Sequence, residues 1–267
     1  MTAIERLNAW FDAAKSVAVA ASGGVDSTTL AIIGHRRLGG ACKVFHSVSP
    51  AVPPLASTRL EEIAKCEGWS YEVVNAGEFD DPAYVANPFN RCFHCKKNLY
   101  GMLASRVDGV LLSGTNLDDL RDYRPGLIAA DSYAVRHPYV EIGMDKSAVR
   151  ALALASGYPE LSELPAAPCL SSRVETGIPI ESEALELIDA VERHVTNQIA
   201  SDTVRCRVRR EGLVVELDEP SLESMEAERR IVLAAAIKRM ASDVGFDLPI
   251  SFSSYSRGSA FVQRDPI

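Results

Sequence analysis

The sequence has little positive charge for its size. It carries 28 Lys and Arg residues against 36 Asp and Glu residues in 267, which gives a formal net charge of −8. Broad binding to RNA or DNA needs a dense basic face, so this balance argues against a nucleic-acid partner. The sequence also lacks a basic and apolar leader and any apolar run near the roughly 18 residues of a membrane span. We therefore expect a cytoplasmic protein with no membrane partner.

Cysteine is scarce, because six residues in 267 are too few for a disulfide framework. In a reduced compartment each cysteine is a core residue, a metal ligand or a reactive thiol. Cys42 falls on a strand pattern and Cys66 on a helix pattern, and both are expected in the core. The sequence has no internal repeat and no low-complexity tract.

Short apolar runs alternate with helical patterns through the first part of the chain. This alternation predicts an α/β fold with an open, mostly parallel, Rossmann-like sheet covered by helices. Such sheets bind ligands beyond the carboxyl ends of their strands. The expected strands are residues 16–21, 42–48, 70–75 and 110–114, and the expected helices are residues 4–14, 28–39, 57–68 and one that Cys92 opens.

A second, smaller α+β domain is expected in the last hundred residues. After a helical pattern at 146–157, residues 158–168 carry three prolines and little periodicity. We therefore predict a domain of residues 1–162 and a domain of residues 163–267. The elements expected in the second are a helix at 181–199, strands at 204–209 and 213–217, a helix at 221–244 and a strand at 250–254.

A glycine-rich turn lies between the first strand and the helix after it. Its residues are Ser22, Gly23, Gly24, Val25, Asp26 and Ser27. The glycines let backbone N–H groups approach an anion, and a helix start adds unsatisfied N–H donors and partial positive charge. The serine hydroxyls can bind phosphate, and Asp26 can cap the helix or help to hold Mg²⁺. The spacing fits neither GxxxxGK[ST] nor GxGxxG, and the alternative is a turn that only caps a helix.

This turn resembles the pyrophosphate loop of PP-loop ATP-pyrophosphatases, which cleave ATP between the α and β phosphates and adenylate an oxygen of their substrate. Four further strings extend the resemblance in order. They are NRCFHCKK at residues 90–97, GTNLDD at 114–119, YRPG at 123–126 and PCLSSR at 168–173. The set is similar to the ATP-dependent sacrificial sulfur transferases, the LarE family of nickel-pincer nucleotide synthesis, from about Ala18 to Arg209.

The resemblance implies a fold of the adenine nucleotide alpha hydrolase type and an enzyme that replaces oxygen by sulfur. ATP with Mg²⁺ would adenylate one carboxylate of a pyridinium dicarboxylate mononucleotide, and a cysteine thiolate would displace AMP. Cleavage of the cysteine Cβ–S bond would then release a thiocarboxylate and leave dehydroalanine. The sacrificed cysteine of the family lies in the motif that residues 168–173 match, so Cys169 is the candidate. Family members form larger assemblies, and a homo-oligomer is expected.

Cys169 lies in an irregular segment with Arg173 four residues further on. A nearby cation lowers the pKa of a thiol and increases the fraction of thiolate. The alternative is a small buried apolar residue. Glu192, on the helix that follows, is a candidate base for Cβ–S cleavage or an ordinary exposed helix glutamate.

Alternate arginines follow the strand expected at 204–209. Arg205, Arg207 and Arg209 share one face of a strand, where guanidinium groups suit a phosphate or carboxylate. The alternative is an exposed sheet edge protected by charge. The resemblance favours Arg205 and Arg207 as ligands of the substrate phosphate, together with Ser172 and Arg173.

Two further groups of residues have more than one interpretation. Cys92 and Cys95 lie at a helix start, and no second pair completes a zinc site, so a dithiol, a [4Fe-4S] cluster shared with Cys169 and a structural pair stay open. Asp118 and Asp119 follow a strand end, where they can bind Mg²⁺ or cap a helix. Asn116 and Arg124 are also expected to bind ATP.

Three other functions fit parts of the pattern. A tRNA thiolation enzyme would use the cysteine pair for zinc or sulfur relay, although the acidic balance opposes RNA binding. An amide-forming ligase that uses ammonia would not need Cys169. A nucleotide sensor without catalysis would bind ATP but would not respond to a carboxylate substrate.

Overall fold

The computed structural model describes residues 1–121 and 123–262, which form two compact units. The first unit comprises Met1–Asp81 and Asn90–Ala167, and the second comprises Pro82–Phe89 and the chain from Pro168 onward. The predicted boundary after residue 162 assigns residues 163–167 to the second domain, whereas their contacts group them with the first unit. Residues 82–89 join the second unit because their backbone pairs with residues 177–180, as in the 2.9 Å bond from Ile180 N to Val85 O.

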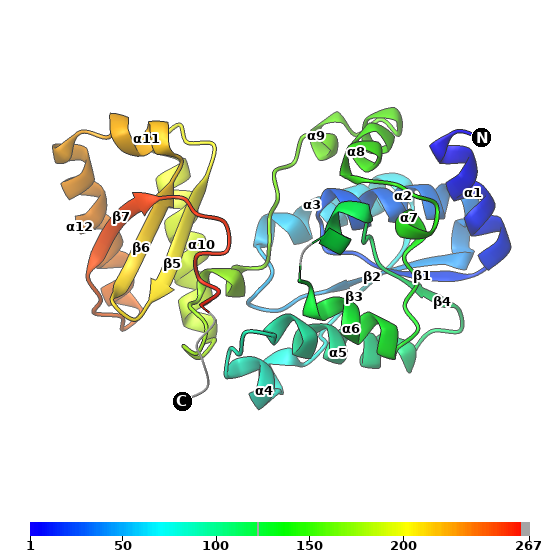
Figure 1. Ribbon diagram of the computed structural model, residues 1–267, viewed down its shortest axis with the longest axis horizontal. Coiled ribbons are helices and arrows are strands. Elements are labelled where there is room, and N and C mark those ends of the chain that lie inside the picture. The colour runs from blue at the N-terminus through cyan, green and yellow to red at the C-terminus, as the bar shows by residue number, and fades with distance from the viewer. Residues whose placement is uncertain (122, 263–267) are drawn as a thin grey trace. The chain divides into compact units, whose positions relative to one another are not determined.

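The first unit contains a four-stranded sheet in the order β3-β2-β1-β4, and all of its strand pairs are parallel (Figure 1). This confirms the predicted α/β class with a Rossmann-like parallel sheet. The carboxyl ends of the strands therefore meet at one edge. The strands are β1 (Val17–Ala20), β2 (Cys42–Ser47), β3 (Ser70–Val74) and β4 (Val110–Leu112).

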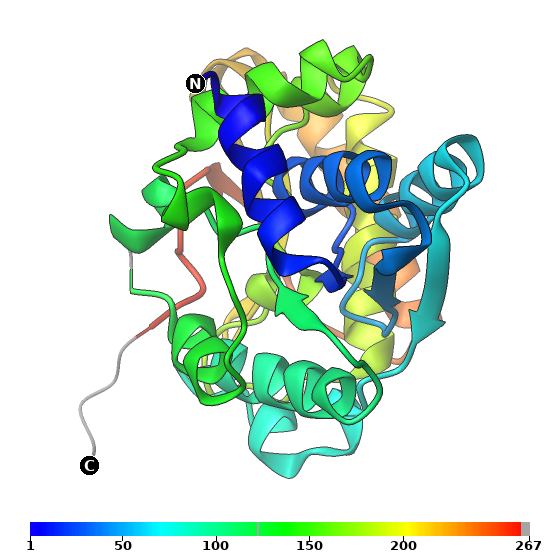
Figure 2. The ribbon, with the colours of Figure 1, turned by 90° about the vertical axis from the view of Figure 1, so that its right-hand side faces the viewer.

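Helices cover both faces of this sheet. One group of helices is α1 (Ala3–Ala14), α2 (Val25–Leu38), α3 (Pro54–Glu67), α7 (Pro138–Glu141), α8 (Lys146–Ala155) and α9 (Pro159–Ser162). The other group is α5 (Arg91–Ala104) and α6 (Pro125–Ser132). In Figures 1 and 2, α1, α2 and α3 lie on one side of the strands, and α5 and α6 lie on the other. Short 3-10 turns complete the unit at η1 (Gly39–Ala41), η2 (Glu78–Asp80) and η3 (Leu117–Arg121).

Two hydrophobic clusters pack between these layers. Val17 and Val19 of β1 face the cluster built on α1, α2, α3 and α8, whereas Ala18 faces the cluster built on α5 and α6. This alternation follows from the two-residue period of a strand. The sequence of β1 is VAVA, which is apolar along its whole length. Such a strand suits a sheet that is covered on both faces.

The second unit is a small α+β body. Its three strands are ordered β5-β6-β7, with β5 and β6 antiparallel and β6 and β7 parallel. The strands are β5 (Val204–Arg209), β6 (Gly212–Leu217) and β7 (Ile250–Ser254). Its helices are α4 (Pro82–Val85), η4 (Leu170–Arg173), α10 (Ser182–Thr196), α11 (Glu219–Ser224) and α12 (Ala227–Asp243). None of the described helices is both long and apolar enough to cross a membrane.

Two sequence-based expectations are wrong. The helix expected at 221–244 is two helices, because Met225 and Glu226 adopt extended backbone angles between α11 and α12. Met225 is 8% exposed, so its side chain packs inward where the chain turns between the helices. Cys66 is exposed on α3, whereas Cys42 is buried in the core as expected.

Candidate functional site

The glycine-rich turn of the first unit is held in shape by its two serines. The Ser22 N–H donates to the Ser27 hydroxyl at 3.0 Å, and the two hydroxyl oxygens lie 3.1 Å apart. Gly23 has a φ of +79°, and a Cβ there would lie 2.6 Å from the carbonyl oxygen of Ala56. Only glycine fits this position without strain. The turn is therefore a preformed backbone cradle at the carboxyl end of β1.

Helix α2 begins directly in this cradle. Its N-cap residue is Gly24, which has no side chain to satisfy the first N–H groups. The first turn of a 14-residue helix thus keeps unsatisfied donors and the positive end of its dipole. This arrangement suits the phosphates of a nucleotide. The alternative in which Asp26 caps the helix is not what the structure shows, because Asp26 makes other contacts.

The carboxylate of Asp26 connects the cradle to distant parts of the first unit. Its Oδ2 lies 2.5 Å from Nζ of Lys146, and its Oδ1 accepts a 3.1 Å hydrogen bond from Nδ2 of Asn116. The Tyr139 hydroxyl donates to the Asp26 carbonyl oxygen at 3.1 Å. Burial raises the pKa of Tyr139 well above its ordinary value, which keeps this donor protonated.

The turn after β4 completes the same network. The Asn116 side-chain oxygen accepts from the Asp118 N–H at 2.9 Å, and Asp119 Oδ2 accepts from the Asn116 N–H at 3.1 Å. Asp118 Oδ2 accepts from the Lys146 N–H at 2.9 Å. Asp119 also pairs with the guanidinium of Arg124 at 2.7 Å. The residues predicted to bind ATP and Mg²⁺ from three separate strings are therefore linked through hydrogen bonds; their roles stay predictions.

Gly114 brings this turn against the cradle. A Cβ on Gly114 would lie 2.5 Å from the backbone nitrogen of Ser27 and 2.8 Å from the carbonyl carbon of Asp26. The end of β4 and the start of α2 can approach this closely only with glycine at residue 114.

Lys146 and Tyr139 contact the candidate site through Asp26, and the sequence did not predict either contact. Lys146 opens α8 directly after its cap Asp145. A cation at a helix N-terminus is unfavourable for the helix dipole, and this misplaced charge is the one feature of the sequence that could have drawn attention to it. Tyr139 lies in a short helix and gives no comparable sign.

The fit to Mg²⁺ rests on carboxylate chemistry. Among residues 1–121 and 123–262, no three His, Cys, Asp or Glu side chains form a metal-binding group. Mg²⁺ is commonly held by one or two carboxylates together with substrate phosphates, so a group of three is not required. Asp26 and Asp118 both contact Lys146 and are carboxylates of this kind. The binding of Mg²⁺ by Asp26, Asp118 or Asp119 stays a prediction.

Cys169 of the second unit is exposed, which excludes the alternative of a small buried core residue. The guanidinium of Arg173 fixes the backbone around it. Its Nη1 donates to the carbonyl oxygens of Pro168 at 2.5 Å and Cys169 at 3.1 Å, and to the Ser172 hydroxyl at 3.0 Å. The thiol is thus presented on a braced segment.

Glu192 is the counter-ion of Arg173. Its two carboxylate oxygens accept from Nε and Nη2 of Arg173 at 2.9 and 3.0 Å, and Oε1 also accepts from the Cys206 N–H at 3.0 Å. The Arg173 side chain is 3% exposed and the Glu192 side chain 14%. The interpretation of Glu192 as an ordinary exposed helix glutamate is therefore wrong. Its role as a base stays a prediction.

The three arginines of β5 differ in their partners. Arg207 donates to Glu216 at 2.9 Å and to the Ser172 carbonyl oxygen at 3.0 Å, and Arg209 pairs with the same Glu216 at 2.7 Å. Both arginines are thereby matched to a carboxylate that is 1% exposed. Burial, followed by the charge of Arg173, lowers the pKa of Arg205. Arg205 is half-buried and lies within the electrostatic reach of Arg173 and Glu192, so it is not a fully solvated residue of the sheet edge. Its contact with a substrate phosphate stays a prediction.

The remaining predicted thiols lie in the first unit. Cys92 and Cys95 are half-buried in the first turns of α5. Their participation in a dithiol or in a cluster with Cys169 stays a prediction.

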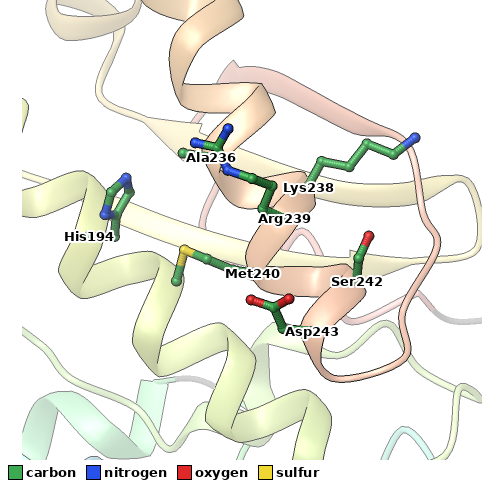
Figure 3. Close-up of a pocket in the computed structure, with 7 residues that line it drawn as sticks. All are labelled: His194, Ala236, Lys238, Arg239, Met240, Ser242 and Asp243. Atoms are coloured by element: carbon green, nitrogen blue, oxygen red, sulfur yellow. The ribbon is translucent and has the colours of Figure 1, made fainter.

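A cavity of about 470 Å³ lies elsewhere on the second unit, against α10 and α12 (Figure 3). Its lining includes His194, Lys238, Arg239, Met240 and Asp243 and contains none of the predicted site residues. A larger cavity of about 700 Å³ borders α3 in the first unit. Arg59 of its wall donates to the Gly23 carbonyl oxygen at 2.9 Å, which connects this wall to the cradle.

The structure defines an α/β protein with a Rossmann-like parallel sheet and a preformed glycine-rich turn at the carboxyl end of β1. No family model matches the chain. The uncharacterized protein slr1717 of Synechocystis is 33% identical over 224 residues, which cover 82% of this chain and 83% of that protein. The chain belongs to the same family as this cyanobacterial protein.

Two more distant relatives match over a similar share of the chain. The uncharacterized protein MJ0830 of Methanocaldococcus jannaschii is 24% identical over 82% of this chain and 84% of its own length. The pyridinium-3,5-bisthiocarboxylic acid mononucleotide synthase of Lactiplantibacillus plantarum is 25% identical over 86% of this chain and 83% of its own length. The name of this distant relative thus agrees with the family that the sequence motifs resemble.

Proposed function

We propose that this protein is an ATP-dependent sulfur transferase of the LarE type. It adenylates a carboxylate of a pyridinium dicarboxylate mononucleotide and replaces one oxygen by the sulfur of Cys169. The observation that carries the proposal is the exposed Cys169 on a segment braced by Arg173, because sacrificial transfer needs an accessible thiol at a fixed place. The distant similarity to the bisthiocarboxylic acid mononucleotide synthase supports the same chemistry.

In the first step, the cradle binds the phosphates of ATP. The backbone N–H groups at the start of α2 and the hydroxyls of Ser22 and Ser27 would contact these phosphates. Bound Mg²⁺ supplies charge neutralisation for the phosphates, and Asp26 and Asp118 are the residues that would hold it. Lys146, now paired with Asp26, is within the same network and stabilises the negative charge that develops on the phosphates.

The substrate carboxylate then attacks the α-phosphorus, forming an acyl adenylate and releasing pyrophosphate. The thiolate of Cys169 attacks the acyl carbon and AMP leaves with the former carboxylate oxygen. The product is a thioester between the substrate and Cys169.

The last step breaks the Cβ–S bond of Cys169. A base removes the α-proton of residue 169, the electrons form a Cα–Cβ double bond, and the thiocarboxylate leaves with the sulfur. Glu192 is the proposed base, because its carboxylate belongs to the Arg173 network around this segment. Arg205, together with Ser172 and Arg173, is the proposed site for the phosphate of the mononucleotide. Arg207 of the predicted set is already paired with the buried Glu216.

The adenylation step is tested by incubating the protein with ATP, Mg²⁺ and the pyridinium dicarboxylate mononucleotide. We expect AMP and pyrophosphate in equal amounts, and only when the dicarboxylate is present. AMP formation that depends instead on ammonia and yields an amide would indicate the ligase, and AMP formation that depends on tRNA would indicate the tRNA thiolation enzyme. ATP binding without any AMP would indicate a nucleotide sensor.

A further inference from the structure

Three side chains at the carboxyl end of β4 form a hydrogen-bonded series that the proposed chemistry does not use. Nδ1 of His137 lies 2.8 Å from the Ser113 hydroxyl oxygen, which lies 2.9 Å from the Thr115 hydroxyl oxygen. Ser113 is 8% exposed, so its hydroxyl has little access to water. The series therefore runs from His137 through the buried Ser113 to Thr115.

The series lies at the edge of the sheet where the cradle is. The backbone of Arg136 pairs with β4, and its carbonyl oxygen accepts from the Ser113 N–H at 3.1 Å, which places His137 beside the strand end. Thr115 directly precedes Asn116, whose amide contacts Asp26. Two residues after His137, the Tyr139 hydroxyl contacts the Asp26 carbonyl oxygen.

The proton on His137 decides how Thr115 is oriented. Burial lowers the pKa of His137, an effect that the charges of Glu141 and Asp119 oppose, so a neutral ring with one protonated nitrogen is the relevant state near neutral pH. If Nδ1 is bare, Ser113 donates to it and accepts from Thr115, whose proton then points inward. If Nδ1 carries the proton, it donates to Ser113, and Ser113 donates to Thr115. The Thr115 proton is then free to point outward, because each hydroxyl has only one proton.

We propose that His137 is a positioning residue for ATP: with Nδ1 protonated, it turns the Thr115 O–H outward to donate to a phosphate oxygen. This inference rests on the proposed ATP site. The opposite tautomer would offer only lone pairs, which repel a phosphate. His137 thus acts through Ser113 and Thr115 rather than by touching the nucleotide.

The test measures ATP affinity by calorimetry at fixed Mg²⁺ for matched variants. We expect Thr115→Val, which keeps the shape and removes the hydroxyl, to weaken ATP binding by about three- to tenfold. We expect His137→Leu to do the same, and the double variant to lose little more than either single variant. Thr115→Ser keeps the hydroxyl, and His137→Asn keeps a donor at the place of Nδ1, so both should bind within about twofold of the wild type.

A second readout is the ¹⁵N chemical shifts of the His137 ring nitrogens with a non-hydrolysable ATP analogue bound. We expect a protonated Nδ1 and a bare Nε2. A bare Nδ1 in the complex, or wild-type affinity in Thr115→Val, would overturn the inference even if His137→Leu failed to fold. If the variants change the ATP affinity as expected but the wild type forms no AMP with the dicarboxylate nucleotide, only the proposed sulfur transfer would be overturned. Failure of the wild type to bind ATP would overturn both.

Discussion

The ammonium group of Lys146 lies 2.5 Å from Oδ2 of Asp26, although 120 residues separate the two in the sequence. Both side chains are partly exposed, at 33% and 24%. A magnesium ion and this ammonium would compete for the same carboxylate oxygen, because both are cations. We therefore expect Lys146 to move from Asp26 to the phosphates when ATP and Mg²⁺ bind.

The substitution Lys146→Met should lower kcat/KM for AMP formation by about 10²- to 10³-fold, the usual loss when one preorganised charge of a site is removed. Lys65→Met is the matched control, since Lys65 is exposed on α3 and pairs with Glu61 on the same helix. It should keep wild-type kinetics. Equal activities of the two variants would contradict a role for Lys146 at the site.

Gly114 should tolerate no side chain. Gly114→Ala would place a Cβ 2.5 Å from Ser27 N, against backbone that belongs to both the cradle and α2. We expect a loss of about 1–3 kcal/mol in the free energy of unfolding, because overpacking forces the backbone to shift, and a lower ATP affinity. Gly40→Ala is the control, since a Cβ there meets nothing within 4 Å. Urea unfolding and calorimetry measure the two effects.

The elements with strong local patterns could be predicted closely from the sequence. The strands at 204–209 and 250–254 agree with the structure to the residue. The break between α11 and α12 could not be predicted, because neither Met225 nor Glu226 is a glycine or a proline. Their extended backbone depends on packing.

The same limit applies to the site. The cradle and the GTNLDD turn are local strings, so their residues could be proposed from the sequence. The partners that fix them are not local. Neither the pairing of Lys146 with Asp26 nor that of Glu216 with Arg207 and Arg209 has a sequence spacing that predicts it, because each depends on how strands and helices fold together.

The buried pair of Arg173 and Glu192 should contribute to stability as well as to chemistry. Glu192→Ala leaves the 3% exposed guanidinium without its counter-ion and should lower the free energy of unfolding by about 3–5 kcal/mol. Asp189→Ala is the control, because it removes a partner of Arg193, which is 60% exposed; it should cost less than about 1 kcal/mol. Similar losses in the free energy of unfolding from the two substitutions would show that the Arg173–Glu192 pair does not stabilise the fold as a buried ion pair.

The role of Glu192 as a base needs a separate variant. Glu192→Gln keeps the shape of the side chain but cannot take up the α-proton of residue 169. We expect AMP release and a stable thioester on Cys169, without cleavage of the Cβ–S bond, when the reaction is followed by mass spectrometry. Normal cleavage in this variant would exclude Glu192 as the base.

Protein stability should fall below neutral pH because of His46. Its Nδ1 lies 3.0 Å from the Ala21 carbonyl oxygen and its Nε2 lies 2.8 Å from the Ser57 hydroxyl, and burial lowers its pKa in the folded state. The unfolded state, with a pKa of about 6.5, then binds more protons, so the free energy of unfolding declines as the pH falls below that value.

This decline has a limit of about 1.4 kcal/mol per pH unit for one histidine. We expect His46→Gln to reduce the slope between pH 7 and pH 5, as measured by urea unfolding at several pH values. Parallel pH profiles of the variant and the wild type would show that His46 does not contribute.

The most direct test of sulfur transfer is the intact mass of the protein after incubation with ATP, Mg²⁺ and the pyridinium dicarboxylate mononucleotide. We predict a loss of about 34 Da, equivalent to one H₂S, which peptide mapping places at Cys169 as dehydroalanine. Cys66→Ser, which removes the exposed thiol of α3, should show the same loss, and Cys169→Ser should show none. An unchanged mass at Cys169 while the thiocarboxylate product accumulates would contradict Cys169 as the sulfur source and would point to another donor, such as a cluster.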